Sequence, residues 1–240
     1  MNAPEYVQKK QLIALLFSLL LISFREISQY FTLFSIVIAS SFVFPLLKKK
    51  IQYSQTLQRL LLLSSLFLPL LVTSDITFSK NPININILLF GVFIVLVLLF
   101  SKRNDFKSIL KFGVSEPINL TKFIVELAIF FMSIIGEELF FRVYTINFFK
   151  ANSGLLAIVI SSIFFVIIHY LNRWASKLFN LKSYVYQFLL SVVLGAVYYF
   201  STNFLYVIFL HTLYNFSFLL ILIRKLKHKN SEVITFDDYD

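Results

Sequence analysis

Long runs of apolar residues, interrupted only by short polar connections, restrict the fold of this chain more than any other feature. A membrane-spanning helix needs about 20 mostly apolar residues, and a lipid-exposed backbone must satisfy its own hydrogen bonds. Hydrophobic residues make up 58% of the 240-residue chain and charged residues only 14%. We therefore predict an all-α fold, a polytopic transmembrane helix bundle.

The apolar runs predict about eight spans, or seven if the first two, separated only by Arg25 and Glu26, form one broken element. Two of the runs are short for a bilayer, the first and the third. The predicted spans are Gln11–Phe24, Ile27–Leu47, Leu60–Thr73, Ile85–Phe100, Phe123–Phe149, Leu155–Tyr170, Tyr184–Phe200 and Phe204–Ile223.

The charge pattern predicts the orientation of these spans. Most of the 22 Lys and Arg residues fall on one side of the predicted bundle if both termini are cytoplasmic, as the positive-inside rule requires. The net charge of +10 is then a topology signal, and its spread over short loops argues against nucleic-acid binding. The absence of Cys excludes a thiol nucleophile and a thiolate metal site. The predicted location is a cell membrane, and residue usage rich in Phe, Ile, Lys and Asn suggests a low-GC bacterial genome.

A few polar groups remain within the apolar runs after the loop charges are set aside. A charged side chain at the centre of a membrane helix costs about 2.5–3.5 kcal/mol, so each needs a structural or functional reason. These residues are Glu126, Glu137, Glu138, Arg142, His169, His211 and Asn215.

Helical spacing accounts for some of these charges. Glu138 and Arg142 are four residues apart, the separation at which a carboxylate reaches a guanidinium on one helix face. Glu126 follows Lys122 by four residues, which predicts an interfacial ion pair. Glu137 has no such partner on its own helix, and an unpaired intramembrane carboxylate is by default a functional-site hypothesis.

Three predicted spans carry the remaining groups, and a bundle that points them inward would form one polar cavity. Taken singly, each of these groups predicts only a polar contact between helices, both for His169 and for the pair His211 and Asn215. Taken together with Glu137, they suit peptide hydrolysis: a carboxylate as general base for water, an imidazole beside it, and donors for an oxyanion. Two His and a Glu also make a zinc ligand set, but no HExxH motif is present.

Three short motifs resemble those of a known family. The segments "EELFFR", "FVIIH" and "HTLYN" fit E-E-x-x-x-R, F-x-x-x-H and H-x-x-x-N/D in that order, and resemble the CAAX-prenyl-protease and bacteriocin-processing (CPBP, or Abi) intramembrane proteases. The resemblance implies that Glu137 and His169 activate water and that Glu138 and Arg142 hold the site together. It further implies that His211 and Asn215 stabilise the oxyanion.

The sequence also leads to expectations for a metal, the domains and the partners. If a metal is bound, we expect zinc on Glu137, His169 and His211, but we favour a metal-free glutamate–histidine mechanism. We predict N-terminal helices with basic cytoplasmic loops (1–122), a catalytic helical core (123–223) and a disordered charged tail (224–240). The expected partners are a peptide or membrane-protein substrate and the lipid bilayer. The alternatives are a non-enzymatic immunity or scaffold protein and an ion-coupled transporter.

Overall fold

The computed structural model describes residues 29–40, 54–72, 84–103, 117–171 and 181–227. Within these ranges every regular element is a helix, as the all-α prediction requires. The first predicted span lies outside them. The predicted disordered tail, residues 224–240, is helical over its first four residues, and the remainder lies outside the described residues. The elements are α2 (Gln29–Ser40), α4 (Ser54–Leu66), α5 (Pro69–Val72), α6 (Ile85–Ser101), α8 (Leu120–Glu138), η1 (Leu139–Ile146), α9 (Asn147–Ser153), α10 (Leu156–Leu171), α12 (Leu181–Ser201), α13 (Phe204–Tyr214) and α14 (Phe216–Lys227).

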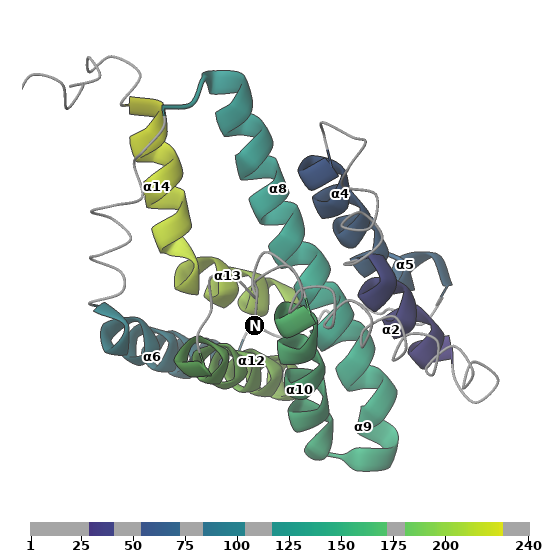
Figure 1. Ribbon diagram of the computed structural model, residues 1–240. Helices are drawn as coiled ribbons and strands as arrows, with labels where there is room; N and C mark the ends of the chain where they lie inside the picture. The colour runs from purple at the N-terminus through teal and green to yellow at the C-terminus, as the bar shows by residue number, and fades with distance from the viewer. Residues whose placement is uncertain (1–28, 41–53, 73–83, 104–116, 172–180, 228–240) are drawn as a thin grey trace, which may run out of the picture.

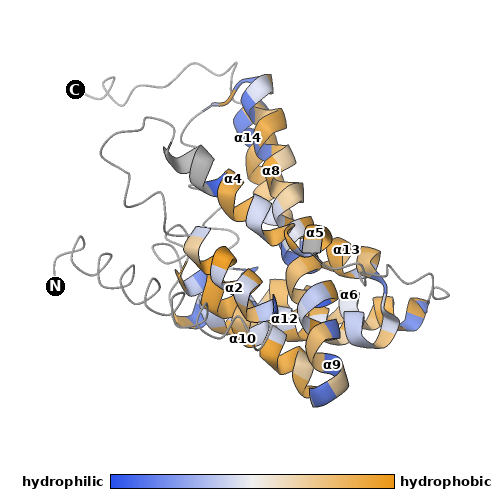
Figure 2. Cartoon of the chain, turned by 90° about the vertical axis from the view of Figure 1, so that its right-hand side faces the viewer, coloured by the Kyte–Doolittle hydropathy of each residue, from blue (hydrophilic) through white to orange (hydrophobic). Residues whose placement is uncertain are grey.

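Several helices match the predicted spans closely, but the number of membrane crossings is not confirmed. In the described residues α12 alone is long and apolar enough to cross a bilayer, and the bent pair α13 and α14 adds a second crossing if it forms one span. Three shorter apolar helices accompany them, α2, α6 and α10. Figure 2 shows that apolar residues dominate most of the helices, while hydrophilic residues gather mainly near helix ends.

The fifth predicted span is one rod with a change of helix type in its middle. It starts at the N-cap Asn119, whose side chain accepts from the amide of Lys122, and runs through α8, η1 and α9 to Gly154. Gly154 ends the rod with a φ of 54°, a value that glycine adopts readily. The middle segment η1 is a π-helix of eight residues, all of them buried. Such segments are rare and often lie at functional sites.

Two predicted spans are broken, which corrects the sequence interpretation. The eighth bends by 58° between α13 and α14, and Asn215 forms the C-cap of α13 at the bend. The amide of Asn215 donates to the carbonyl of His211, and its own carbonyl accepts from Phe218, so one residue bonds both helices. The third predicted span divides into α4 and α5 just before Pro69, a residue suited to the first turn of a helix.

The helices pack around the long rod (Figure 1). Helix α14 lies along one side of α8, and α4 lies on the other side and packs against α2. Helix α12 packs against α10, α6, α13 and η1 at the other end of the rod. Gly195 allows the close approach there, because a Cβ added at this position would lie 2.9 Å from a methyl group of Ile158. This packing surrounds η1 and encloses the polar groups next to it.

The partner of Glu126 is not the one that local spacing predicted. Its Oε2 lies 3.1 Å from Nη1 of Arg59, a residue of α4 that falls in the loop just before the predicted span Leu60–Thr73. The pair therefore joins α4 to α8 rather than bracing α8 alone. Helix packing overrides the local rule here, because the i, i+4 preference amounts to only about 0.2–0.5 kcal/mol.

The Arg59–Glu126 pair is expected to add little to stability. The two side chains are 39% and 25% exposed, and pairs in contact with solvent contribute about 0–1 kcal/mol. We expect Glu126→Gln to melt within a few degrees of the wild type in detergent, with the difference shrinking as salt is added. A large loss of thermal stability that persists at high salt would contradict this assignment.

Candidate active site

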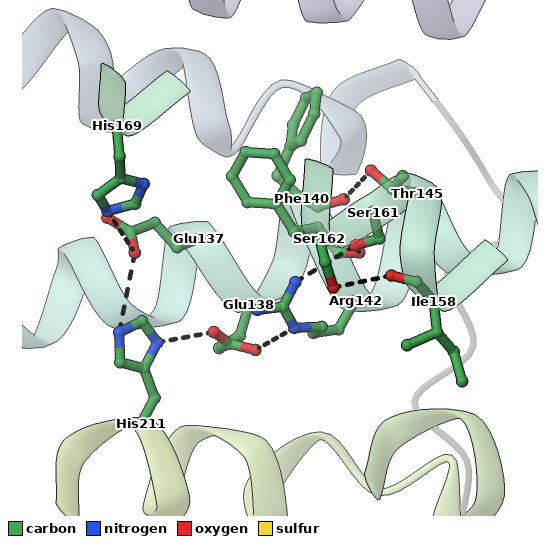
Figure 3. A network of polar contacts seen from close by, with 11 residues as sticks. Glu137, Glu138, Phe140, Arg142, Thr145, Ile158, Ser161, Ser162, His169 and His211 are labelled. Carbon is green, nitrogen blue, oxygen red and sulfur yellow. Dashed lines mark hydrogen bonds and ion pairs between the residues drawn. The ribbon is translucent and has the colours of Figure 1, made fainter. Parts of the chain in front are cut away.

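A carboxylate on the last residue of α8 forms the centre of a buried polar cluster (Figure 3). Glu138 Oε2 lies 3.1 Å from Arg142 Nε, so the predicted ion pair is present. Its other oxygen, Oε1, lies 2.7 Å from Nδ1 of His211 on α13. Glu138 and Arg142 are completely buried, and His211 is 3% exposed. The rod and α13 are thus joined through buried contacts of the Glu138 carboxylate with Arg142 and His211.

Arg142 has further partners on α10. Its Nη1 donates to the hydroxyl of Ser161 at 3.2 Å, and that hydroxyl donates to the carbonyl of Phe141. The guanidinium also lies over the ring of Phe165, 5.1 Å from its centre, which is a cation–π contact. A buried charge persists in a protein when it is paired and hydrogen-bonded. Here Nη1 is hydrogen-bonded and Nε is ion-paired with Glu138, whereas Nη2 makes no hydrogen bond to the described residues.

Glu137 occupies the more accessible side of the cluster, together with His169 from α10. Its Oε2 lies 3.9 Å from Nε2 of His169 and 3.9 Å from Nε2 of His211. The side chains of Glu137 and His169 are 21% and 20% exposed, against 4% for His211. The two adjacent glutamates therefore have different environments, one buried in ion pairs and one facing two imidazoles at the edge of the cluster.

The outer bonds of both histidines determine where their protons lie. Nδ1 of His169 is 2.9 Å from the carbonyl of Phe165, which only accepts, so Nδ1 carries the hydrogen. Nδ1 of His211 faces the carboxylate of Glu138, which favours the same tautomer. In the neutral form of each ring, Nε2 is then a lone-pair acceptor. Both lone-pair nitrogens lie nearest Glu137, so these three side chains place only acceptors at this point.

The excess of acceptors has a consequence for protons and water. With neutral imidazoles the two glutamates and Arg142 sum to one negative charge. A water placed among the three acceptors has only two hydrogens to donate. One added proton, shared by Glu137 and the imidazoles, would balance both the charge and the hydrogen bonds. The arrangement is therefore suited to taking a proton from water.

The structure brings five of the six predicted site residues together and leaves one at the edge. Asn215 lies one turn after His211, at the bend between α13 and α14. Within the described part of the chain, its side chain makes no hydrogen bond to the glutamates or histidines. Asn215 is the C-cap of α13, and its backbone amide still makes the helical bond to the carbonyl of His211, so it lies one turn beyond that residue.

Sequence reasoning missed one member of the cluster. Ser161 is not among the predicted site residues, yet its hydroxyl bonds both Arg142 and the backbone of η1. The signal that could have found it is the spacing of Ser161, Phe165 and His169 along one face of α10. Phe165 itself lies between the charges, with its ring 4.2 Å from the centre of the His169 ring.

The side chains fit a zinc ion in chemistry but not in position. Two Nε2 atoms and a carboxylate are suitable ligands, and the bonds at Nδ1 are the outer bonds that metal-bound histidines usually make. Tetrahedral ligands at zinc bond lengths are about 3.3 Å apart, which is shorter than the two 3.9 Å separations. In the described residues no group of three His, Asp or Glu side chains is arranged to hold a metal ion.

Comparison with known proteins bears on the segment that contains this cluster. Residues 119–217 match the family model of the type II CAAX prenyl endopeptidases, Rce1-like. The resemblance to CAAX proteases is confirmed for this segment. The CAAX-protease-like segment runs from the N-cap of α8 to the first turn of α14 and contains every predicted site residue. No curated protein and no solved structure gave a significant match to the chain.

Proposed function

We propose that the cluster is the active site of an intramembrane endopeptidase that hydrolyses peptide bonds with an activated water. The observation that carries the proposal is the meeting of Glu137, His169 and His211, with Oε2 of the carboxylate 3.9 Å from Nε2 of each histidine. The match of residues 119–217 to CAAX prenyl endopeptidases supports the reaction class. The apolar helices α2, α6, α10 and α12 fit a membrane-embedded protein.

In this proposal Glu137 is the general base. Its carboxylate accepts a proton from a water that also hydrogen-bonds to Nε2 of His169, and the resulting hydroxide attacks the carbonyl carbon of the substrate. Both groups are partly exposed, so water and a peptide reach them. A positioned base of this kind contributes about 10²–10⁴-fold to the rate. The proton held at this edge is then delivered to the leaving amine.

His211 acts opposite the base, and Glu138 prepares it for that role. The carboxylate of Glu138, 2.7 Å from Nδ1, orients the ring so that Nε2 points toward Glu137. When Nε2 of His211 carries a proton, it can hydrogen-bond the oxyanion of the tetrahedral intermediate. The side-chain NH₂ of Asn215 is the proposed second donor. Arg142 holds Glu138 in place through the ion pair at 3.1 Å. Peptide or membrane-protein segments are the proposed substrates.

The competing function is binding without catalysis, as in an immunity or scaffold protein that keeps a polar core. Quantitative proteomics of membranes with and without the protein distinguishes the two, with Glu137→Ala as the matched inactive control. Endopeptidase activity requires new N-termini that appear with the wild type and not with Glu137→Ala. If the two proteins give the same cleavage products, or none at any expression level, the proposed activity is wrong.

The metal requirement gives a separate test. We expect purified protein to contain much less than one equivalent of zinc and to keep its activity in chelator, because the 3.9 Å separations suit a bridging water better than a shared ion. Elemental analysis and cleavage assays in EDTA check this. Stoichiometric zinc, with activity lost on stripping and restored on adding it back, would overturn the metal-free mechanism while leaving the peptidase assignment intact.

A further inference from the structure

A side-chain hydrogen bond from α2 reaches the π-helical segment η1. The hydroxyl of Tyr30 lies 3.2 Å from Oγ1 of Thr145, and Oγ1 donates to the carbonyl of Phe140 at 2.8 Å. Tyr30, Thr145 and Phe140 are completely buried. The three groups form one chain of hydrogen bonds that starts on α2 and ends on the backbone of η1.

The direction of this chain follows from the number of available hydrogens. Thr145 has one hydroxyl hydrogen, which it gives to Phe140, because a carbonyl oxygen can only accept. The hydrogen between Tyr30 and Thr145 must then come from the phenol. Tyr30 is therefore a donor that keeps the Thr145 hydroxyl turned toward the backbone.

The end point of the chain matches the register of a π-helix. In an α-helix a carbonyl pairs with the amide four residues later, whereas in a π-helix it pairs with the amide five residues later. Thr145 is five residues after Phe140, so its side chain spans the same interval as the π-helical backbone bond. The hydroxyl thus adds a bond that an α-helical register would not reproduce in the same geometry.

The register of η1 determines how the active-site groups face one another. Glu137 and Glu138 directly precede the segment, and Arg142 lies inside it. A change from π- to α-helical register rotates every later residue about the rod axis, which would turn Arg142 away from Ser161 on α10. Errors of about 1 Å at a reacting group can cost about 10²-fold in rate.

Tyr30 is itself held rigidly enough to serve this purpose. Its ring stacks with those of Phe148 at 5.0 Å, Tyr144 at 5.5 Å and Phe34 at 6.1 Å between centres. Two of these neighbours belong to the rod, so α2 is anchored on both sides of Thr145 in the sequence. Aromatic pairs of this kind fix geometry as well as burying area.

We propose that Tyr30 and Thr145 are positioning residues for the peptidase, and that α2 thereby supplies a necessary part of the active site from outside residues 119–217. The expected effect of these two residues on cleavage rests on the proposed function. Their expected effect on the structure of η1 does not. Neither side chain touches the substrate; both act by keeping the π-helical register that orients Glu137, Glu138 and Arg142.

The test uses full-length protein in detergent and two measurements. Hydrogen exchange followed by mass spectrometry reports the protection of peptides covering residues 139–146, and a cleavage assay on a peptide identified by proteomics reports kcat and KM. We expect Tyr30→Phe and Thr145→Val to speed exchange of these peptides and to lower kcat about tenfold with KM nearly unchanged. Thr145→Ser retains the hydroxyl and is expected to restore both values.

A matched control and a double variant complete the design. Ser40→Ala removes a buried hydrogen bond between α2 and α4, at 3.0 Å from Ser65, without touching η1, and is expected to change neither measurement. The Tyr30→Phe/Thr145→Val double variant should behave like Thr145→Val, because both residues act through one chain. Unchanged exchange of 139–146 in both single variants, or equal effects from Ser40→Ala, would overturn the inference. If the wild type shows no peptidase activity but the variants still exchange faster over residues 139–146, the proposed function is refuted. The role of Tyr30 and Thr145 in positioning η1 is then retained.

Discussion

Glu138→Ala is expected to unfold in detergent at a much lower temperature than Glu137→Ala, although the two residues are adjacent and chemically identical. Removing Glu138 leaves the fully buried Arg142 without its ion-pair partner and takes the acceptor away from Nδ1 of His211. Loss of one partner of a buried pair typically costs about 3–5 kcal/mol. Glu137 is partly exposed and its nearest ion-pair contacts are 3.9 Å long, so its removal strands no charge.

Thermal melts of the two single variants and of Glu138→Ala/Arg142→Leu check this assignment. The double variant removes the stranded guanidinium and should recover part of the lost stability, since an apolar side chain replaces an uncompensated charge. The recovery should be incomplete, because His211 still lacks its partner. Equal melting temperatures for Glu137→Ala and Glu138→Ala would show that the two carboxylates are not divided into a structural and a reactive one.

Glu137→Gln is expected to lower the cleavage rate by about 10²–10⁴-fold while leaving the protein folded. The amide keeps the shape of the side chain but cannot take a proton from water. The substitution strands no buried charge, because Glu137 is partly exposed and its contacts to the two imidazoles are 3.9 Å long, so thermal stability should stay close to that of the wild type. Turnover near the wild-type rate on any identified substrate would remove Glu137 from the role of general base.

The sequence allowed much of the site to be predicted, because some of its contacts are local. Glu138 and Arg142 lie within one turn of each other, and that spacing is enough to predict their ion pair. The same local spacing predicts that Glu137 has no ion-pair partner on its own helix. That His169 and His211 meet this carboxylate depends on the packing of α10 and α13 against the rod, which no spacing within a single helix specifies.

Other features had no clear signal in the sequence. The bend at Asn215 occurs without Gly or Pro, and the hydrogen bond from Tyr30 of α2 to Thr145 of η1 joins residues 115 positions apart in the sequence. Arg59 was assigned to a loop because α4 begins six residues earlier than the apolar run does. In each case contacts between helices outweigh local preferences of a few tenths of a kcal/mol.

His211 joins the structural and reactive halves of the cluster, since its Nδ1 faces Glu138 and its Nε2 faces Glu137. By thermodynamic linkage, whatever engages Nε2 also changes the free energy of the buried ion pair behind Nδ1. In the proposed active site, a substrate or inhibitor that hydrogen-bonds Nε2 is therefore expected to change the strength of the contact between α13 and the rod. Ligand binding at the proposed site and the packing of α13 against the rod are thereby expected to be coupled through the imidazole of His211.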